Sequence, residues 1–226
     1  MDEQPYGLIL KRAGFVLVAI GSIDFGWMIY CMFNRIAYSS SLNIFAVIAG
    51  VLLIRGGLKT AGIVRWLALL VLSALVTVAV VLPFLQPIGL WVAEIRFRTL
   101  SVVTSSVVMV ALAAALYWVA RELGREPVQI ARDSAGFKRG SARVPVLFGF
   151  GLVVLVSLFL TIFLDGDSAE RAKREAAKEV GPGFTLHVTS LYISDSPGHK
   201  RVSAVVTAWN DKEVRDIPVQ WEEEGN

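Results

Sequence analysis

One acidic residue, Asp24, occupies a place where it could carry chemistry. It lies in the middle of an apolar stretch, residues 13–33, that has the length of a membrane-spanning helix. A charge at the centre of a bilayer costs about 3 kcal/mol on insertion scales, so acids at this depth commonly serve protons, cations or substrates. Matching depths along the other apolar stretches places Ser73 and Ser157 nearest to its level. These three residues form the candidate intramembrane polar site.

Three interpretations of Asp24 are open. Its carboxyl group is neutral and makes a structural hydrogen bond between helices, or it pairs with a group on another protein, or it serves as a transport position. No cation lies near its depth in the predicted spans. Because many intramembrane polar groups only join helices, the structural hydrogen bond is the simplest interpretation.

A second candidate is the basic segment at residues 121–143, which lies between two long apolar stretches. Short basic loops of this kind stay on the cytoplasmic side of a membrane. Its charges are therefore interpreted as topological, in contact with anionic lipid, with docking of a cytoplasmic partner as the alternative. The basic residues of this segment are Arg121, Arg125, Arg132, Lys138, Arg139 and Arg143.

No pattern in the sequence predicts catalysis or metal binding. The two histidines, His187 and His199, combine with Asp195 in no spacing that is typical of metal ligands. No serine lies in a nucleophile elbow, and no glycine-rich loop is suited to phosphates. We therefore expect no enzyme activity, no cofactor and no metal.

The elements that position these residues are apolar helices, because 55% of the 226 residues are hydrophobic. About 20 helical residues cross a hydrocarbon core of about 30 Å, and five stretches approach that length. Small residues such as Gly50 and Gly149 are predicted to mark helix contacts. Residues 84–98 are expected to form an outer loop or an interfacial helix. The five predicted spans are residues 13–33, 38–54, 64–82, 100–120 and 144–164, of which the second is the shortest.

The distribution of positive charge predicts how these helices are oriented in a membrane. Short segments predicted to lie inside carry eleven Lys or Arg, and short outer segments carry three. The N-terminus is therefore predicted to be cytoplasmic and the C-terminal tail to lie outside. This basic excess is topological, so no nucleic-acid partner is expected. Arg outnumbers Lys fifteen to seven, which indicates a bacterial inner membrane and a periplasmic tail.

The tail, residues 165–226, is predicted to form a small α+β domain. A helix capped by Asp167 or Ser168 is expected to run through Val180. Three strands follow as an antiparallel meander, with Pro218 favouring an edge position for the third. A unit of this size buries little core. We therefore expect it to lean on the membrane, a neighbouring subunit or another protein.

The predicted fold class is thus an all-α polytopic membrane protein with a small extracytoplasmic α+β domain. The predicted function is a non-enzymatic membrane subunit, a scaffold, assembly factor or sensor. Its tail would bind a protein partner or mediate homo-oligomerisation. The alternative is a small transporter or channel component that uses Asp24. A membrane enzyme is the third possibility, and it would need a wet polar cluster at one membrane face, which the sequence does not predict.

Overall fold

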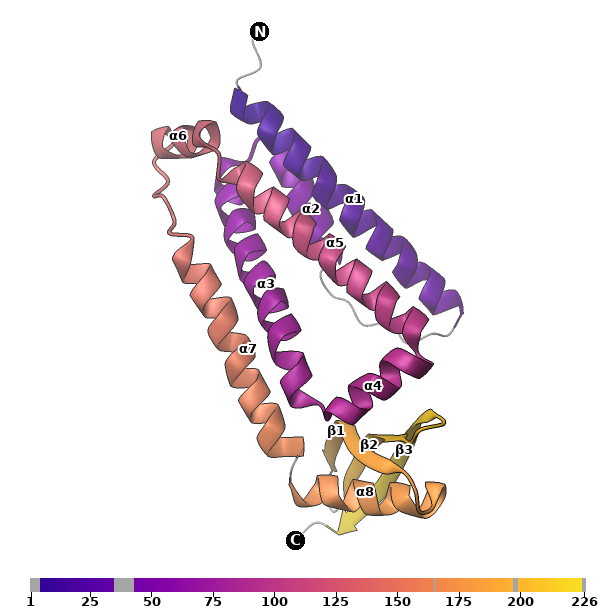
Figure 1. Cartoon of the computed structure of the whole chain (residues 1–226). Coiled ribbons are helices and arrows are strands. Elements are labelled where there is room, and N and C mark those ends of the chain that lie inside the picture. Colours follow the sequence, from indigo (N-terminus) through magenta and orange to yellow (C-terminus); the bar gives the residue numbers. More distant parts are fainter. Residues whose placement is uncertain (1–4, 35–42, 165, 197–198, 225–226) are drawn as a thin grey trace. The chain divides into compact units, whose positions relative to one another are not determined.

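The computed structural model describes residues 5–34, 43–164, 166–196 and 199–224 (Figure 1). The chain is mostly helical and ends in a small three-stranded antiparallel sheet. The elements are α1 (Pro5–Phe33), α2 (Asn43–Ile54), α3 (Leu58–Leu85), α4 (Ile88–Phe97), α5 (Thr99–Leu123), α6 (Glu126–Ser134), α7 (Arg143–Leu164), α8 (Asp167–Val180), β1 (Thr185–Ser196), β2 (His199–Trp209) and β3 (Val214–Glu224).

Four helices, α1, α3, α5 and α7, are long and apolar enough to cross a membrane. The shortest of them, α7, has 22 residues, which corresponds to about 33 Å of helix. Large apolar side chains on these helices are exposed, among them Phe15 at 63%, Val107 at 62% and Leu147 at 68%. An apolar surface of this kind is stable in an apolar surrounding, which a lipid bilayer supplies.

The predicted second span, residues 38–54, is described only from residue 43 onward. Its helical part, α2, has only 12 residues or about 18 Å, so this helix alone is too short to cross a bilayer. Residues 38–42 lie outside the described part of the chain. α2 packs closely on α1, since a Cβ atom at Gly14 would lie 2.6 Å from the carbonyl oxygen of Gly50. The predicted helix contact at Gly50 is confirmed.

Residues 84–98, predicted to form an outer loop or an interfacial helix, contain the helix α4, and the predicted basic loop is also largely helical. α3 continues two residues past Pro83, which removes one hydrogen bond from the last part of this helix, and Pro87 then precedes α4. The basic segment, residues 121–143, is not a plain loop, because α5 extends to Leu123 and α6 follows almost directly. Pro127 lies in the first turn of α6, where its missing N–H costs no hydrogen bond.

The chain divides into two compact units, residues 1–76 with 109–150, and residues 77–108 with 151–226. The core of the first unit forms where the N-terminal part of α1, the end of α2, the start of α3, the end of α5 and α6 meet. The completely buried side chains of this core include Leu10, Ala13, Leu53, Val119, Leu123 and Val128.

The second unit contains the predicted antiparallel meander, with strand order β1-β2-β3. α8 covers one face of the sheet with a stripe of alanines that packs on valines of the strands. The helix begins after Gly166 rather than at a side-chain cap from Asp167 or Ser168, and it ends at Gly181, whose φ is +73°. Pro218 lies on β3, an edge strand, as predicted.

Candidate functional site

The intramembrane candidates lie on three different helices. Asp24 is half-buried on α1 and takes part in an interaction within the chain. Ser73 is half-buried on α3, and its hydroxyl donates to the carbonyl of Leu70 on the same helix at 2.9 Å. Ser157 is half-buried on α7. That hydrogen bond directs the Ser73 hydroxyl proton to its own helix. A polar site shared by Asp24, Ser73 and Ser157 therefore stays a prediction.

The two edges of the sheet differ in chemistry. β3 carries charges and Pro218, which are the devices that keep an edge strand from pairing with other chains. β1 has twelve residues with no proline and a single acid, Asp195. Among the described residues no further strand pairs with β1, and its Tyr192 is 70% exposed. β1 therefore lacks the proline and the run of charges that protect β3.

A bulge shapes this edge. The pairing of β1 with β2 shifts register between Val188 and Ser190, which leaves Thr189 as the extra residue. The Thr189 hydroxyl donates to the carbonyl of Val205 at 3.0 Å. Bulges bend a strand and increase its local twist. The outer part of β1, from Ser190 onward, therefore runs in a different direction from its first residues.

A line of polar side chains crosses the sheet beside the bulge. Thr207 on β2 is only 2% exposed, and its hydroxyl donates to Oδ1 of Asp216 on β3 at 2.9 Å. Oδ2 of Asp216 accepts from Arg98, at the end of α4, at 2.8 Å. The Thr189 hydroxyl lies 3.4 Å from that of Thr207. Polar contacts thus connect the bulge with α4.

Apolar contacts hold α4 on the same unit. Leu90 and Ala93 of α4 form a buried cluster with Trp209, and Val214 packs against them. A Cβ atom at Gly89 would lie 3.3 Å from the Trp209 indole nitrogen, so glycine permits the close approach. The support that we expected the tail to find elsewhere comes, at least in part, from α4 of the same chain.

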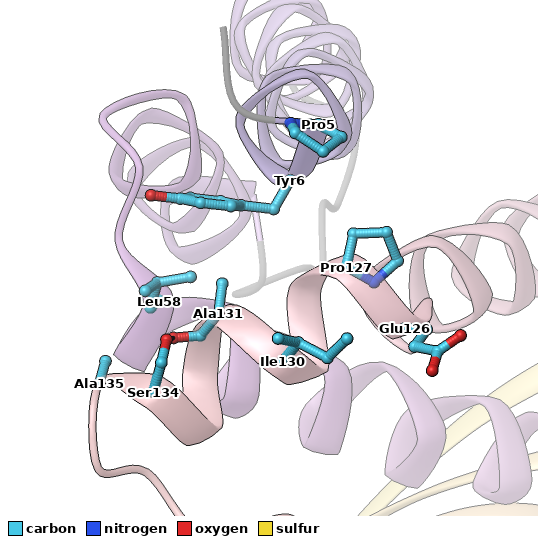
Figure 2. Close-up of a pocket in the computed structure, with 9 residues that line it drawn as sticks. All are labelled: Pro5, Tyr6, Leu58, Glu126, Pro127, Ile130, Ala131, Ser134 and Ala135. Atoms are coloured by element: carbon cyan, nitrogen blue, oxygen red, sulfur yellow. Dashed lines mark hydrogen bonds between the residues drawn. The ribbon is translucent and has the colours of Figure 1, made fainter.

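The basic segment is organised around α6 in the first unit. Figure 2 shows an open hollow between α1, α3 and α6, lined mainly by apolar groups such as Tyr6, Leu58 and Ile130. Two of the six predicted basic residues form ion pairs, Arg125 with Glu122 at 2.7 Å and Arg139 with Asp133 at 2.6 Å. The exposed members of the set are Arg121, Arg125, Lys138, Arg139 and Arg143, and Arg132 alone is half-buried.

Within the described residues, no three His, Cys, Asp or Glu side chains lie close enough together to hold a metal ion. No model of a known protein family matches the chain, and no curated protein or solved structure matches it either. What the protein does is therefore inferred from the geometry of its own residues.

Proposed function

We propose that this chain is a non-enzymatic integral membrane protein whose α+β domain binds a protein partner outside the membrane. The N-terminus is cytoplasmic in this proposal, and the α+β domain is periplasmic. Positive charge supports that orientation, because the basic segment around α6 holds six Lys or Arg and basic segments stay inside. The α1–α2 pair also supports it, since α2 brings the chain back beside the N-terminal half of α1.

The observation that carries the proposal is the contrast between the two sheet edges. Edge strands expose unpaired backbone N–H and C=O groups, which a strand of another chain can pair with. Pro218 and several charged residues hinder another strand from pairing with β3, whereas β1 has neither a proline nor a run of charges. The exposed Tyr192 side chain offers a large contact surface at that edge. The proposed partner therefore adds an extended segment along β1.

Site-specific photo-crosslinking in native membranes tests this proposal. A photoreactive phenylalanine analogue replaces Tyr192 on β1 of the full-length protein. The matched control replaces Gln220 on β3, which lies on the same face because both positions pair with Ser203 of β2. We expect a defined adduct from position 192 and none from position 220. Adducts of equal yield at both edges, or at neither, would refute the choice of β1.

The mass of the adduct identifies the partner. An adduct with a second copy of the chain would replace the separate partner with homo-oligomerisation. Truncation after Leu164 removes the domain, so co-purification of the partner should be lost with it. A partner that remains bound to the truncated chain would place the interaction in the apolar helices instead.

The alternative function, a small transporter or channel component, rests on Asp24. Its half-buried carboxyl group in an apolar helix supports this reading. Asp24→Asn keeps the shape of the side chain and removes its charge. Loss of a pH- or cation-dependent flux in vesicles, with normal assembly, would favour transport, and unchanged assembly and growth would favour a structural hydrogen bond.

A further inference from the structure

Two arginines from different helices meet at the start of α3. The guanidinium group of Arg132, on α6, lies against Gly62 of α3, where a Cβ atom would be 2.7 Å from Cζ of Arg132. Arg65 follows Gly62 by three residues and so lies on the same side of α3. Its own guanidinium lies beside Gly124, where a Cβ atom would be 3.3 Å from Cζ of Arg65. Two glycines thus leave room for the two cationic groups.

The positive charge of this arginine pair, Arg65 and Arg132, is not balanced within the unit. The Arg132 guanidinium packs against Gly62, one turn before Arg65 on the same side of α3, so two like charges share this side of the helix. Two carboxylates of the segment that carries Arg132, Glu122 and Asp133, are engaged by other arginines. In the described part of the chain neither member of the pair forms an ion pair with a carboxylate. An anion placed between them would remove the repulsion.

The arginine pair also has unused hydrogen-bond donors. Nε of Arg65 and Nε of Arg132 are both buried without a hydrogen-bond partner. An unsatisfied buried donor costs about 1–3 kcal/mol, so this arrangement is incomplete without a further acceptor. Both residues are half-buried rather than completely buried.

We propose that Arg65 and Arg132 together bind the phosphate group of an anionic phospholipid. The planar fork of a guanidinium group matches two phosphate oxygens, and two forks from different helices would hold one phosphate from two sides. Arg65 lies in the second turn of α3, about 10 Å along a helix that is long and apolar enough to span a membrane. Arginines at that depth extend toward the headgroup region. The site is separate from the β1 edge, so each proposal can fail alone.

Lipid titration followed by native mass spectrometry tests the site. Full-length protein in an uncharged detergent is titrated with phosphatidylglycerol, with zwitterionic phosphatidylcholine, and with inorganic phosphate. We expect one tightly held phosphatidylglycerol, whose affinity falls about tenfold in Arg65→Gln and again in Arg132→Gln, as loss of a charged hydrogen-bond donor implies. Lys138→Gln removes the same charge from an exposed position nearby and should leave the affinity close to that of the wild type.

The outcomes separate a defined site from general attraction. An equal loss in Lys138→Gln and the arginine variants would show diffuse charge and overturn the proposal, as would unchanged binding in the double arginine variant. Inorganic phosphate that binds to the same arginines as tightly as the lipid would keep the phosphate chemistry and overturn the lipid as its source.

A second variant controls for the possibility that the Gln variants lose binding because they misfold. Arg132→Lys keeps the charge and removes the planar fork, so its affinity should fall less than that of Arg132→Gln. The lipid should raise the melting temperature of the wild type and have no such effect on the double arginine variant. Equal lipid-induced shifts in both proteins would contradict the proposal even if their basal stabilities differ.

Discussion

Asp216 makes two interactions, one with Thr207 and one with Arg98. We predict that the interaction that is less exposed to solvent is the stronger one. Oδ1 of Asp216 accepts a hydrogen bond from Thr207, which is 2% exposed, and its Oδ2 pairs with Arg98. A hydrogen bond between a buried hydroxyl and a carboxylate contributes about 1.5 kcal/mol or more. In the ion pair, the side chains of Arg98 and Asp216 are 36% and 45% exposed, so water and salt reduce its contribution to about 0.5 kcal/mol.

Double-mutant cycles separate these two couplings. One cycle combines Thr207→Val with Asp216→Ala, and the other combines Arg98→Gln with Asp216→Ala. Amide hydrogen exchange in β2 and β3 of the full-length protein reports the free energy of local opening for each variant. We expect the Thr207 coupling to be about three times the Arg98 coupling, as the two contributions imply.

Salt supplies an independent check on the same variants. Raising the ionic strength should reduce the Arg98 coupling and leave the Thr207 coupling nearly unchanged, because only the exposed pair is screened. If the Arg98 coupling were the larger one, or if both couplings fell equally with salt, the argument from exposure would be wrong.

Three further changes test other parts of the fold. Gly14→Ala should destabilise the protein by about 1–3 kcal/mol in thermal unfolding, because its Cβ would clash with α2, whereas Gly26→Ala, with open space around it, should not. Hydrogen bonds from lysines three residues later lower the pKa values of Glu170 and Glu175. Their stabilisation of α8 is therefore present at neutral pH and lost as the pH falls through those lowered pKa values, which circular dichroism of the wild type against a double Gln variant measures. Trp209→Ala should weaken protection of α4 amides against hydrogen exchange by about 3–5 kcal/mol, and Trp209→Phe by less.

The sequence predicted the elements whose physical signal is local. Four of the five apolar stretches became long helices, because apolar composition and length are properties of one segment. The alternation in the tail predicted the meander, and Pro218 predicted an edge strand, since a proline cannot donate to a sheet. Gly50 marked a true helix contact with α1.

Features that depend on contacts between distant segments were not predicted. The placement of Arg98 beside Asp216 joins residues that are 118 positions apart, and neither residue alone indicates its partner. The arginine pair was hidden for the same reason, since Arg132 was counted only as part of a basic loop. The helix α6 was not predicted, because a helix of nine residues is too short to show a clear helical period in a segment rich in turn-forming residues.

The position of α4 has a mechanical consequence. This ten-residue helix joins the end of α3 to the start of α5, and it is fastened to the sheet through Trp209 and Asp216. A pull on the sheet is therefore transmitted to the ends of two apolar helices. If a ligand of the domain favours one arrangement of this junction, a bilayer that favours the same arrangement must strengthen the ligand's binding by the reciprocal factor. Under the proposed function, bilayer thickness would then be a variable that tunes the affinity of the partner for the sheet.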